Sequence, residues 1–171
     1  MSQNMKTSTK YYKANLWLFI ATAAYFLMNG AQLWETAIMV PAWTAAPPES
    51  LLFFKGTYGL DFKNFWIIVH SSHEMFLLIA LIFNWRFKKR RNFMLLLLVA
   101  HISVRVWTLL YFAPIIMEFQ AMNVKPMTDP VLLEKAAQWR NLNYLRVALF
   151  FLINMGFAQL LWSNQKETVN A

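Results

Sequence analysis

Four apolar stretches, each long enough to cross the hydrocarbon core of a membrane as a helix, constrain this chain most. Such a helix needs about 20 residues, and the stretches cover roughly residues 15–40, 64–85, 92–117 and 140–162. Their interiors lack the strict alternation of a barrel strand, and only helices or closed barrels satisfy the backbone in lipid. The sequence therefore predicts an all-α, polytopic membrane four-helix bundle that forms one domain over residues 1–171.

The composition agrees with a membrane protein. The chain is 58% hydrophobic and only 14% charged, whereas soluble domains carry roughly 25% charged residues. It has no cysteine, which excludes disulfides, thiolate nucleophiles and cysteine-ligated metal centres. The net charge of +8 comes from basic residues that gather beside the apolar stretches, so we expect membrane lipids rather than nucleic acid as partners.

The placement of Lys and Arg predicts the orientation of the helices. Cytoplasmic segments of membrane proteins carry an excess of these residues. The excess lies in the N-terminus, the second connection and the C-terminus, at Lys6, Lys10, Lys13, Arg86, Lys88, Lys89, Arg90, Arg91 and Lys166. We therefore expect both termini to be cytoplasmic, in a bacterial inner membrane.

Prolines predict the boundaries of the two longer connections. Pro41, Pro47 and Pro48 are expected to end the first helix, because proline lacks an N–H and restricts the residue before it. Asp129 and Pro130 are expected to be the N-cap and first helical position of a stretch, Val131 to Arg140, that precedes the fourth span.

Polar residues inside the predicted spans are the strongest indication of function. An ionisable residue in the bilayer centre costs at least about 2.5 to 3.5 kcal/mol on insertion scales, so it must pair or be hydrated. His70 and Glu74 share one helix face with His73 beside them, and His101 and Arg105 repeat the four-residue spacing. The polar residues that we expect to matter, from all four spans, are Gln32, Glu35, His70, His73, Glu74, His101, Arg105, Asn143 and Arg146.

Depth along the helices predicts that these residues meet. With a rise of about 1.5 Å per residue, they fall near the midplane and in the outer half of the bilayer. The inner halves of the spans are almost entirely apolar. The sequence therefore predicts one polar pocket that opens toward the outer side.

Three alternatives to a catalytic pocket use the same residues. In the first, Glu35 and Glu74 offset nearby arginines and the network only stabilises the bundle. In the second, His70, Glu74 and His101 bind a divalent metal, Zn, Fe or Mn, against the repulsion of the neighbouring guanidinium groups. In the third, His70 and His101 are axial ligands of a haem. We therefore expect either no cofactor or a divalent metal ion, and haem has the least support of the three alternatives.

Three short strings lie at the ends of the predicted spans. They are Asn29-Gly30 to Pro41-Ala42-Trp43, Tyr111-Phe112-Ala113-Pro114, and Trp139-Arg140-Asn141-Leu142-Asn143-Tyr144-Leu145-Arg146. They resemble the anthrone-oxygenase-like superfamily of small four-helix membrane proteins. Characterised fungal members oxidise an anthrone to an anthraquinone, so the resemblance implies oxygen chemistry on a flat, lipophilic phenol. It carries over most directly at Asn143 and Arg146.

Together, these features predict an oxygenase-like membrane oxidoreductase that acts on a lipophilic phenolic or quinol-like substrate. The residues expected to act as general bases are His70, Glu74 and His101. The residues expected to bind substrate or stabilise a developing oxyanion are Gln32, Glu35, His73, Arg105, Asn143 and Arg146. The alternative is a non-catalytic protein that binds a lipid or small ligand, with a structural polar cluster.

Overall fold

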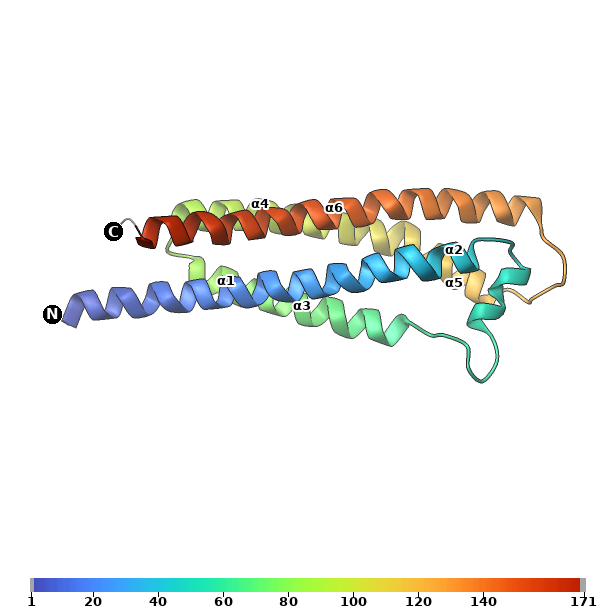
Figure 1. The fold of residues 1–171 in the computed structure, drawn as a ribbon, viewed down its shortest axis with the longest axis horizontal. Helices are drawn as coiled ribbons and strands as arrows, with labels where there is room; N and C mark the ends of the chain where they lie inside the picture. Colours follow the sequence, from blue (N-terminus) through green and yellow to red (C-terminus); the bar gives the residue numbers. More distant parts are fainter. Residues whose placement is uncertain (1, 170–171) are drawn as a thin grey trace. The chain divides into compact units, whose positions relative to one another are not determined.

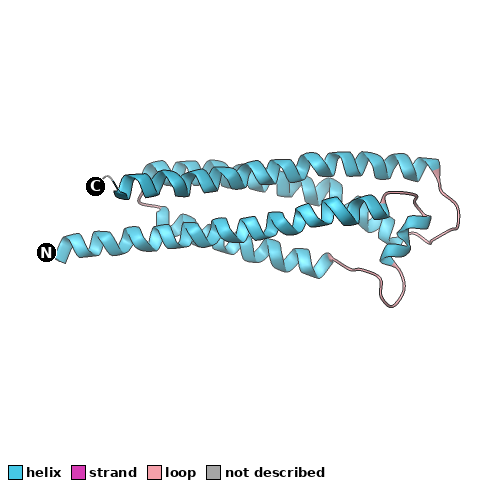
Figure 2. Cartoon of the chain, viewed as in Figure 1, coloured by secondary structure: helices cyan, strands magenta, loops and turns pink. Residues whose placement is uncertain are grey.

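The computed structural model describes the backbone of residues 2–169 and the side chains of residues 9–163. Within this range no strand occurs, and loops are confined to the connections between helices (Figure 2). The side chains of Lys6 and Lys166, which enter the charge count, lie outside the described residues. The elements, labelled in Figure 1 where space allows, are α1 (Ser2–Trp34), η1 (Glu35–Met39), α2 (Val40–Trp43), η2 (Glu49–Phe54), α3 (Lys63–Asn84), α4 (Lys88–Trp107), η3 (Thr108–Phe112), α5 (Ala113–Ala121) and α6 (Pro130–Val169).

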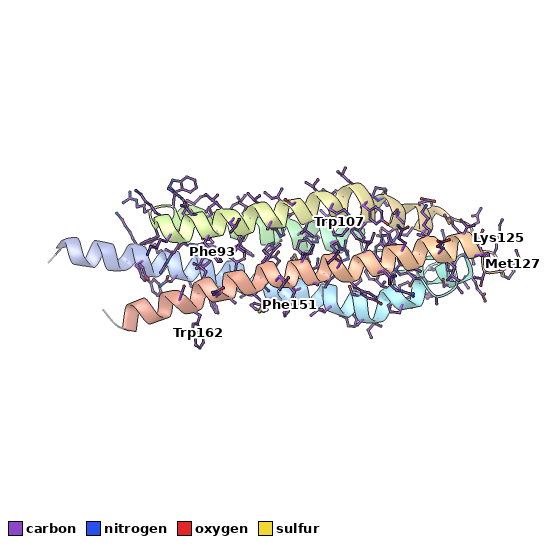
Figure 3. All side chains as sticks on the ribbon, turned by 90° about the horizontal axis from the view of Figure 1, so that it is seen from above. Phe93, Trp107, Lys125, Met127, Phe151 and Trp162 are labelled. Atoms are coloured by element: carbon purple, nitrogen blue, oxygen red, sulfur yellow. The ribbon has the colours of Figure 1, made fainter. Side chains whose placement is uncertain are left out.

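Among the described residues, four helical stretches are long and apolar enough to cross a membrane, which is consistent with an integral membrane protein. They are Thr9–Trp43, Lys63–Asn84, Lys88–Ala121 and Pro130–Ser163. The predicted all-helical fold, with four helices apolar enough to span a membrane, is confirmed. Large apolar side chains are exposed on these helices, including Leu27 and Leu110 at 77% each, as lipid-facing positions require. Trp162 likewise projects away from α6 (Figure 3), whereas Lys125 and Met127 lie in the loop before it.

Proline does not end the first helix where the sequence predicted. The helix continues past Pro41 and ends at Trp43, after the π-helical segment η1. Proline in a helix removes one N–H and collides with the preceding turn, and a local π-helical turn accommodates this disruption. The same combination occurs in the third span, where η3 precedes Pro114 in α5.

The start of α6 confirms the predicted cap. Asp129 Oδ1 accepts hydrogen bonds from the backbone N–H groups of Val131 at 2.8 Å and Leu132 at 3.3 Å, and Pro130 is the first helical residue. The stretch Val131 to Arg140 and the predicted fourth span form one helix, because α6 runs without interruption from Pro130 to Val169.

The contacts divide the chain into two compact units, which are described separately. Unit 1 comprises Met1–Met28, Trp66–His101 and Phe151–Ala171, and unit 2 comprises Asn29–Phe65 and Ile102–Phe150. The single domain predicted from the sequence stays a prediction.

A buried arginine connects three helices of unit 1. Arg90, at the start of α4, is only 5% exposed. Its Nη1 donates to Asn15 Oδ1 at 2.8 Å and Asn84 Oδ1 at 3.4 Å, and its Nη2 donates to the Tyr11 hydroxyl. The guanidinium also lies 4.4 Å from the centre of the Tyr11 ring and 5.1 Å from that of Phe87. Arg90 thereby joins α4 to α1 and to the end of α3.

Close packing of α4 and α6 within unit 1 depends on a glycine. A Cβ at Gly156 would lie 2.7 Å from Leu97 Cδ2, whereas a Cβ at Gly30 would meet nothing within 4 Å. We expect Gly156→Leu to destabilise the protein by about 1 to 3 kcal/mol through overpacking, and Gly30→Leu to leave stability unchanged or raise it slightly. Thermal unfolding of both variants in one detergent checks this. Equal stabilities would contradict the close approach.

Aromatic side chains form the core of unit 2. The ring of Trp43 lies 5.0 Å from that of Trp139 and 5.2 Å from that of Phe119, and Phe112 lies 5.5 Å from Trp139. Trp139 Nε1 donates a hydrogen bond of 3.1 Å to the carbonyl of Phe112. This bond fixes the end of η3 against α6.

Candidate functional site

Unit 1 joins a tyrosine, a histidine and a glutamate from three helices. The hydroxyl of Tyr25 on α1 is 2.8 Å from Nδ1 of His101 on α4. Nε2 of His101 is 3.6 Å from Oε1 of Glu74 on α3. Tyr25 and His101 are fully buried, whereas the Glu74 side chain is 40% exposed. The three groups form a chain from the interior of unit 1 to its surface.

The other two histidines lie on α3 in the same unit. The buried ring of His73 packs 4.2 Å from the ring of Tyr25 and 5.1 Å from that of His101. His70 is also buried, and its ring lies 5.5 Å from that of Trp66. The structure thus brings Glu74, His101 and His73 into one cluster around Tyr25.

Tyr25 is a site residue that the sequence reasoning missed. It is not among the polar residues of the spans that were expected to matter. The available signal was its hydroxyl, because a buried tyrosine O–H needs a hydrogen-bond partner. The partner, His101, lies on a different helix, so residue spacing along one helix could not identify it.

The arrangement around His101 permits proton transfer in either direction. A neutral imidazole donates from one ring nitrogen and accepts at the other, and both nitrogens donate when it is protonated. The carboxylate of Glu74 beside Nε2 favours a proton on that nitrogen. The hydroxyl of Tyr25 can donate to Nδ1 or accept from it. His101 can therefore gain or lose a proton while both nitrogens keep suitable neighbours.

The same geometry bears on the metal and haem alternatives. Nδ1 of His101 is 2.8 Å from the hydroxyl of Tyr25, and Nε2 lies 3.6 Å from Oε1 of Glu74. Among the described residues, no three His, Asp or Glu side chains are grouped so that they could hold a metal ion. The three candidate ligands His70, Glu74 and His101 therefore do not form a metal site here.

Unit 2 contains a second polar cluster, built from the first and fourth spans. Asn143 Nδ2 donates to Thr36 Oγ1 at 3.1 Å, and its Oδ1 accepts from Arg146 Nη2 at 2.6 Å. The Arg146 guanidinium lies 4.5 Å from the centre of the Phe112 ring. Asn143 is fully buried and Arg146 is 9% exposed. Thr36 was missed because a threonine in a helix usually bonds its own i−4 carbonyl, as Thr22 does.

The remaining predicted binding residues also belong to unit 2. The charges of Glu35 and Arg105 both act on Arg146, and Gln32 is buried at 2% exposure. Five of the six predicted substrate-binding residues thus lie in unit 2, and His73 lies in unit 1 with the predicted bases. The single pocket containing all nine residues stays a prediction.

No family model, curated protein or solved structure matches this chain. Over the residues that the structure describes, the protein is all-helical, with four helices long and apolar enough to cross a membrane. Membership of the anthrone-oxygenase-like superfamily stays a prediction from the three strings.

Proposed function

We propose that this protein is a membrane-embedded, oxygenase-like oxidoreductase that oxidises a lipophilic phenolic or quinol-like substrate. The observation that carries the proposal is the chain from Tyr25 through His101 to Glu74, with separations of 2.8 and 3.6 Å. Oxidation of a quinol releases two protons, and a buried site that performs it needs groups able to take them. Glu74 and His101 are two such groups in contact.

The proposed reaction begins at Glu74. This side chain is the exposed member of the chain, so a substrate dissolved in the bilayer reaches it first and transfers its hydroxyl proton to the carboxylate. His101 takes the second proton while Tyr25 holds the imidazole in position. Dioxygen is the oxidant: hydroquinone and dioxygen give quinone and hydrogen peroxide. With an anthrone-type substrate, the methylene carbon and dioxygen give a carbonyl and water.

The second candidate function is binding without catalysis. It is favoured by the burial of Tyr25 and His101, which keeps both away from direct contact with a substrate. In that case the chain from Tyr25 to Glu74 stabilises unit 1, and a lipophilic ligand binds without being oxidised.

Oxygen uptake distinguishes the two functions. Purified protein in lipid nanodiscs is supplied with decylhydroquinone, and dioxygen loss, quinone absorbance and hydrogen peroxide are recorded together. The proposal predicts equal amounts of all three, at a rate well above that of empty nanodiscs. If decylhydroquinone binds saturably but oxygen uptake is no faster than in empty nanodiscs, the protein binds the quinol without oxidising it, and the enzyme proposal is wrong.

The proposal includes an orientation in a bacterial inner membrane, with both termini and residues 86–91 in the cytoplasm. Alkaline phosphatase folds actively only outside the cytoplasm, so fusions test this placement. We expect a fusion after Arg91 to be inactive and fusions after Asp61 or Lys125 to be active. Activity after Arg91 would reverse the orientation.

A further inference from the structure

Two contacts within unit 2 set the register between the first and fourth spans. Asn143 Nδ2 bonds Thr36 Oγ1 at 3.1 Å, and Asn29 Nδ2 bonds the carbonyl of Phe150 at 3.4 Å. The two helices run in opposite directions with the same rise per residue. Thr36 is therefore level with Asn143, and Asn29 is level with Phe150. Between these two contacts, Gln32 is level with Val147, the residue that follows Arg146.

Buried polar atoms without partners occur at this level. In the part of the chain that the structure describes, Arg146 Nε has no hydrogen-bond partner, and neither do Gln32 Oε1 and Asn29 Oδ1. All three residues are at least nine-tenths buried. A buried donor or acceptor left without a partner costs about 1 to 3 kcal/mol. One cationic donor and two neutral acceptors are therefore unsatisfied at neighbouring levels of the first and fourth spans.

The charges at this level favour a single negative charge. Arg105 and Arg146 carry two positive charges, and Glu35, whose charge also acts on Arg146, carries one negative charge. Arg146 Nη2 has two hydrogens, and Asn143 accepts one of them. The other hydrogen and the Nε–H remain for an oxyanion, the bidentate arrangement in which arginine binds best.

The surroundings indicate where such an anion comes from. Large apolar side chains are exposed on the helices of unit 2, including Trp34 and Ile38 near Gln32 in sequence and Leu145 next to Arg146. These side chains suit an acyl chain.

We propose that unit 2 binds the head group of an amphiphile that carries one negative oxyanion and a neighbouring hydroxyl. Arg146 holds the oxyanion, Asn143 positions the guanidinium, and Gln32 Oε1 accepts a hydrogen bond from the hydroxyl. Two sources have this chemistry: a hydroxylated fatty acid, with a carboxylate, and phosphatidylglycerol, with a phosphodiester beside glycerol hydroxyls. The site uses no residue of the chain from Tyr25 to Glu74, so it is independent of the proposed oxidation.

Binding to the full-length protein in a neutral detergent tests the proposal. The probes are 3-hydroxydecanoate and dioctanoyl phosphatidylglycerol, and the controls are decanoate, which lacks the hydroxyl, and dioctanoyl phosphatidylcholine, which lacks the net charge. Calorimetry is expected to show one site that binds at least one hydroxylated probe about tenfold more tightly than its control, a difference of about 1.4 kcal/mol. The probe that binds more tightly identifies the source.

Two variants and a matched control complete the test. Arg146→Gln should weaken binding of the preferred probe at least tenfold. Gln32→Leu should remove the preference for 3-hydroxydecanoate over decanoate, and it should weaken binding of phosphatidylglycerol. Arg140→Gln removes the same charge on the same helix, but Arg140 Nη1 bonds Thr44 Oγ1 at 3.1 Å, so binding should not change. Absence of saturable binding to the wild type, or equal affinities in wild type and Gln32→Leu, would overturn the proposal and leave buried water as the partner of these atoms.

Discussion

Glu74→Gln is expected to reduce quinol-dependent oxygen uptake by about 10²- to 10⁴-fold, the usual contribution of a general base. Glutamine has nearly the shape of glutamate but cannot accept the proton that the substrate releases. It also removes the carboxylate that lies 3.6 Å from His101 Nε2. Because the Glu74 side chain is 40% exposed, the loss of this pair should change stability by about 1 kcal/mol or less.

A second glutamate provides the matched control. Glu118 accepts hydrogen bonds of 2.6 and 2.7 Å from Lys135 Nζ, and its side chain is 49% exposed. Glu118→Gln makes the same chemical change in an ion pair of unit 2 and should leave oxygen uptake as in the wild type. Full uptake in Glu74→Gln, or equal losses in both variants, would exclude Glu74 as the base.

The sequence predicted the four spans well because each depends on a local property. An apolar run of about 20 residues has few alternatives to a membrane helix, and Asp129 caps α6 through the next residues of the chain. The prediction failed at Pro41, where a rule from soluble helices was applied to a helix that continues through a π-helical segment. The fourth helix begins earlier than the predicted span, because the span was bounded by its apolar residues and α6 also includes the more polar stretch from Val131 to Arg140.

The site was predicted less completely because its contacts join different helices. Helical spacing identified His70, Glu74 and His101 as polar residues of the spans, but it could not choose their partners. Glu74, predicted as a base, lies 3.6 Å from His101 Nε2. In the alternative in which the network only stabilises the bundle, Glu35 and Glu74 offset nearby arginines, and the charge of Glu35 acts on Arg146. The partner of His101 within hydrogen-bond distance, Tyr25, carries no charge, so the charge count gave no indication of it.

The largest effect on stability is expected at Arg90, which makes hydrogen bonds to Asn15, Asn84 and Tyr11. Arg90→Ala removes the guanidinium and leaves the buried Asn84 Oδ1 without this donor. Hydrogen bonds to charged groups contribute about 1.5 to 3 kcal/mol each, so the variant should lose about 3 kcal/mol or more. For a chain of this size, that corresponds to a fall in Tm of about 6 to 12 °C.

Arg91→Ala is the control variant for Arg90→Ala. It also removes one positive charge beside the membrane, but it leaves the hydrogen bonds of Arg90 intact. Arg91 is the next residue, but its guanidinium lies 5.2 Å from the Trp85 ring and bonds exposed Asn92 Oδ1 at 3.2 Å. Exposed contacts of this kind contribute about 1 kcal/mol or less, so Arg91→Ala should unfold within about 4 °C of the wild type. Thermal unfolding of both variants, followed by circular dichroism in one detergent, measures the difference. If the two variants unfold at the same temperature, Arg90 stabilises unit 1 only through its charge, and the contacts to α1 and α3 contribute nothing measurable.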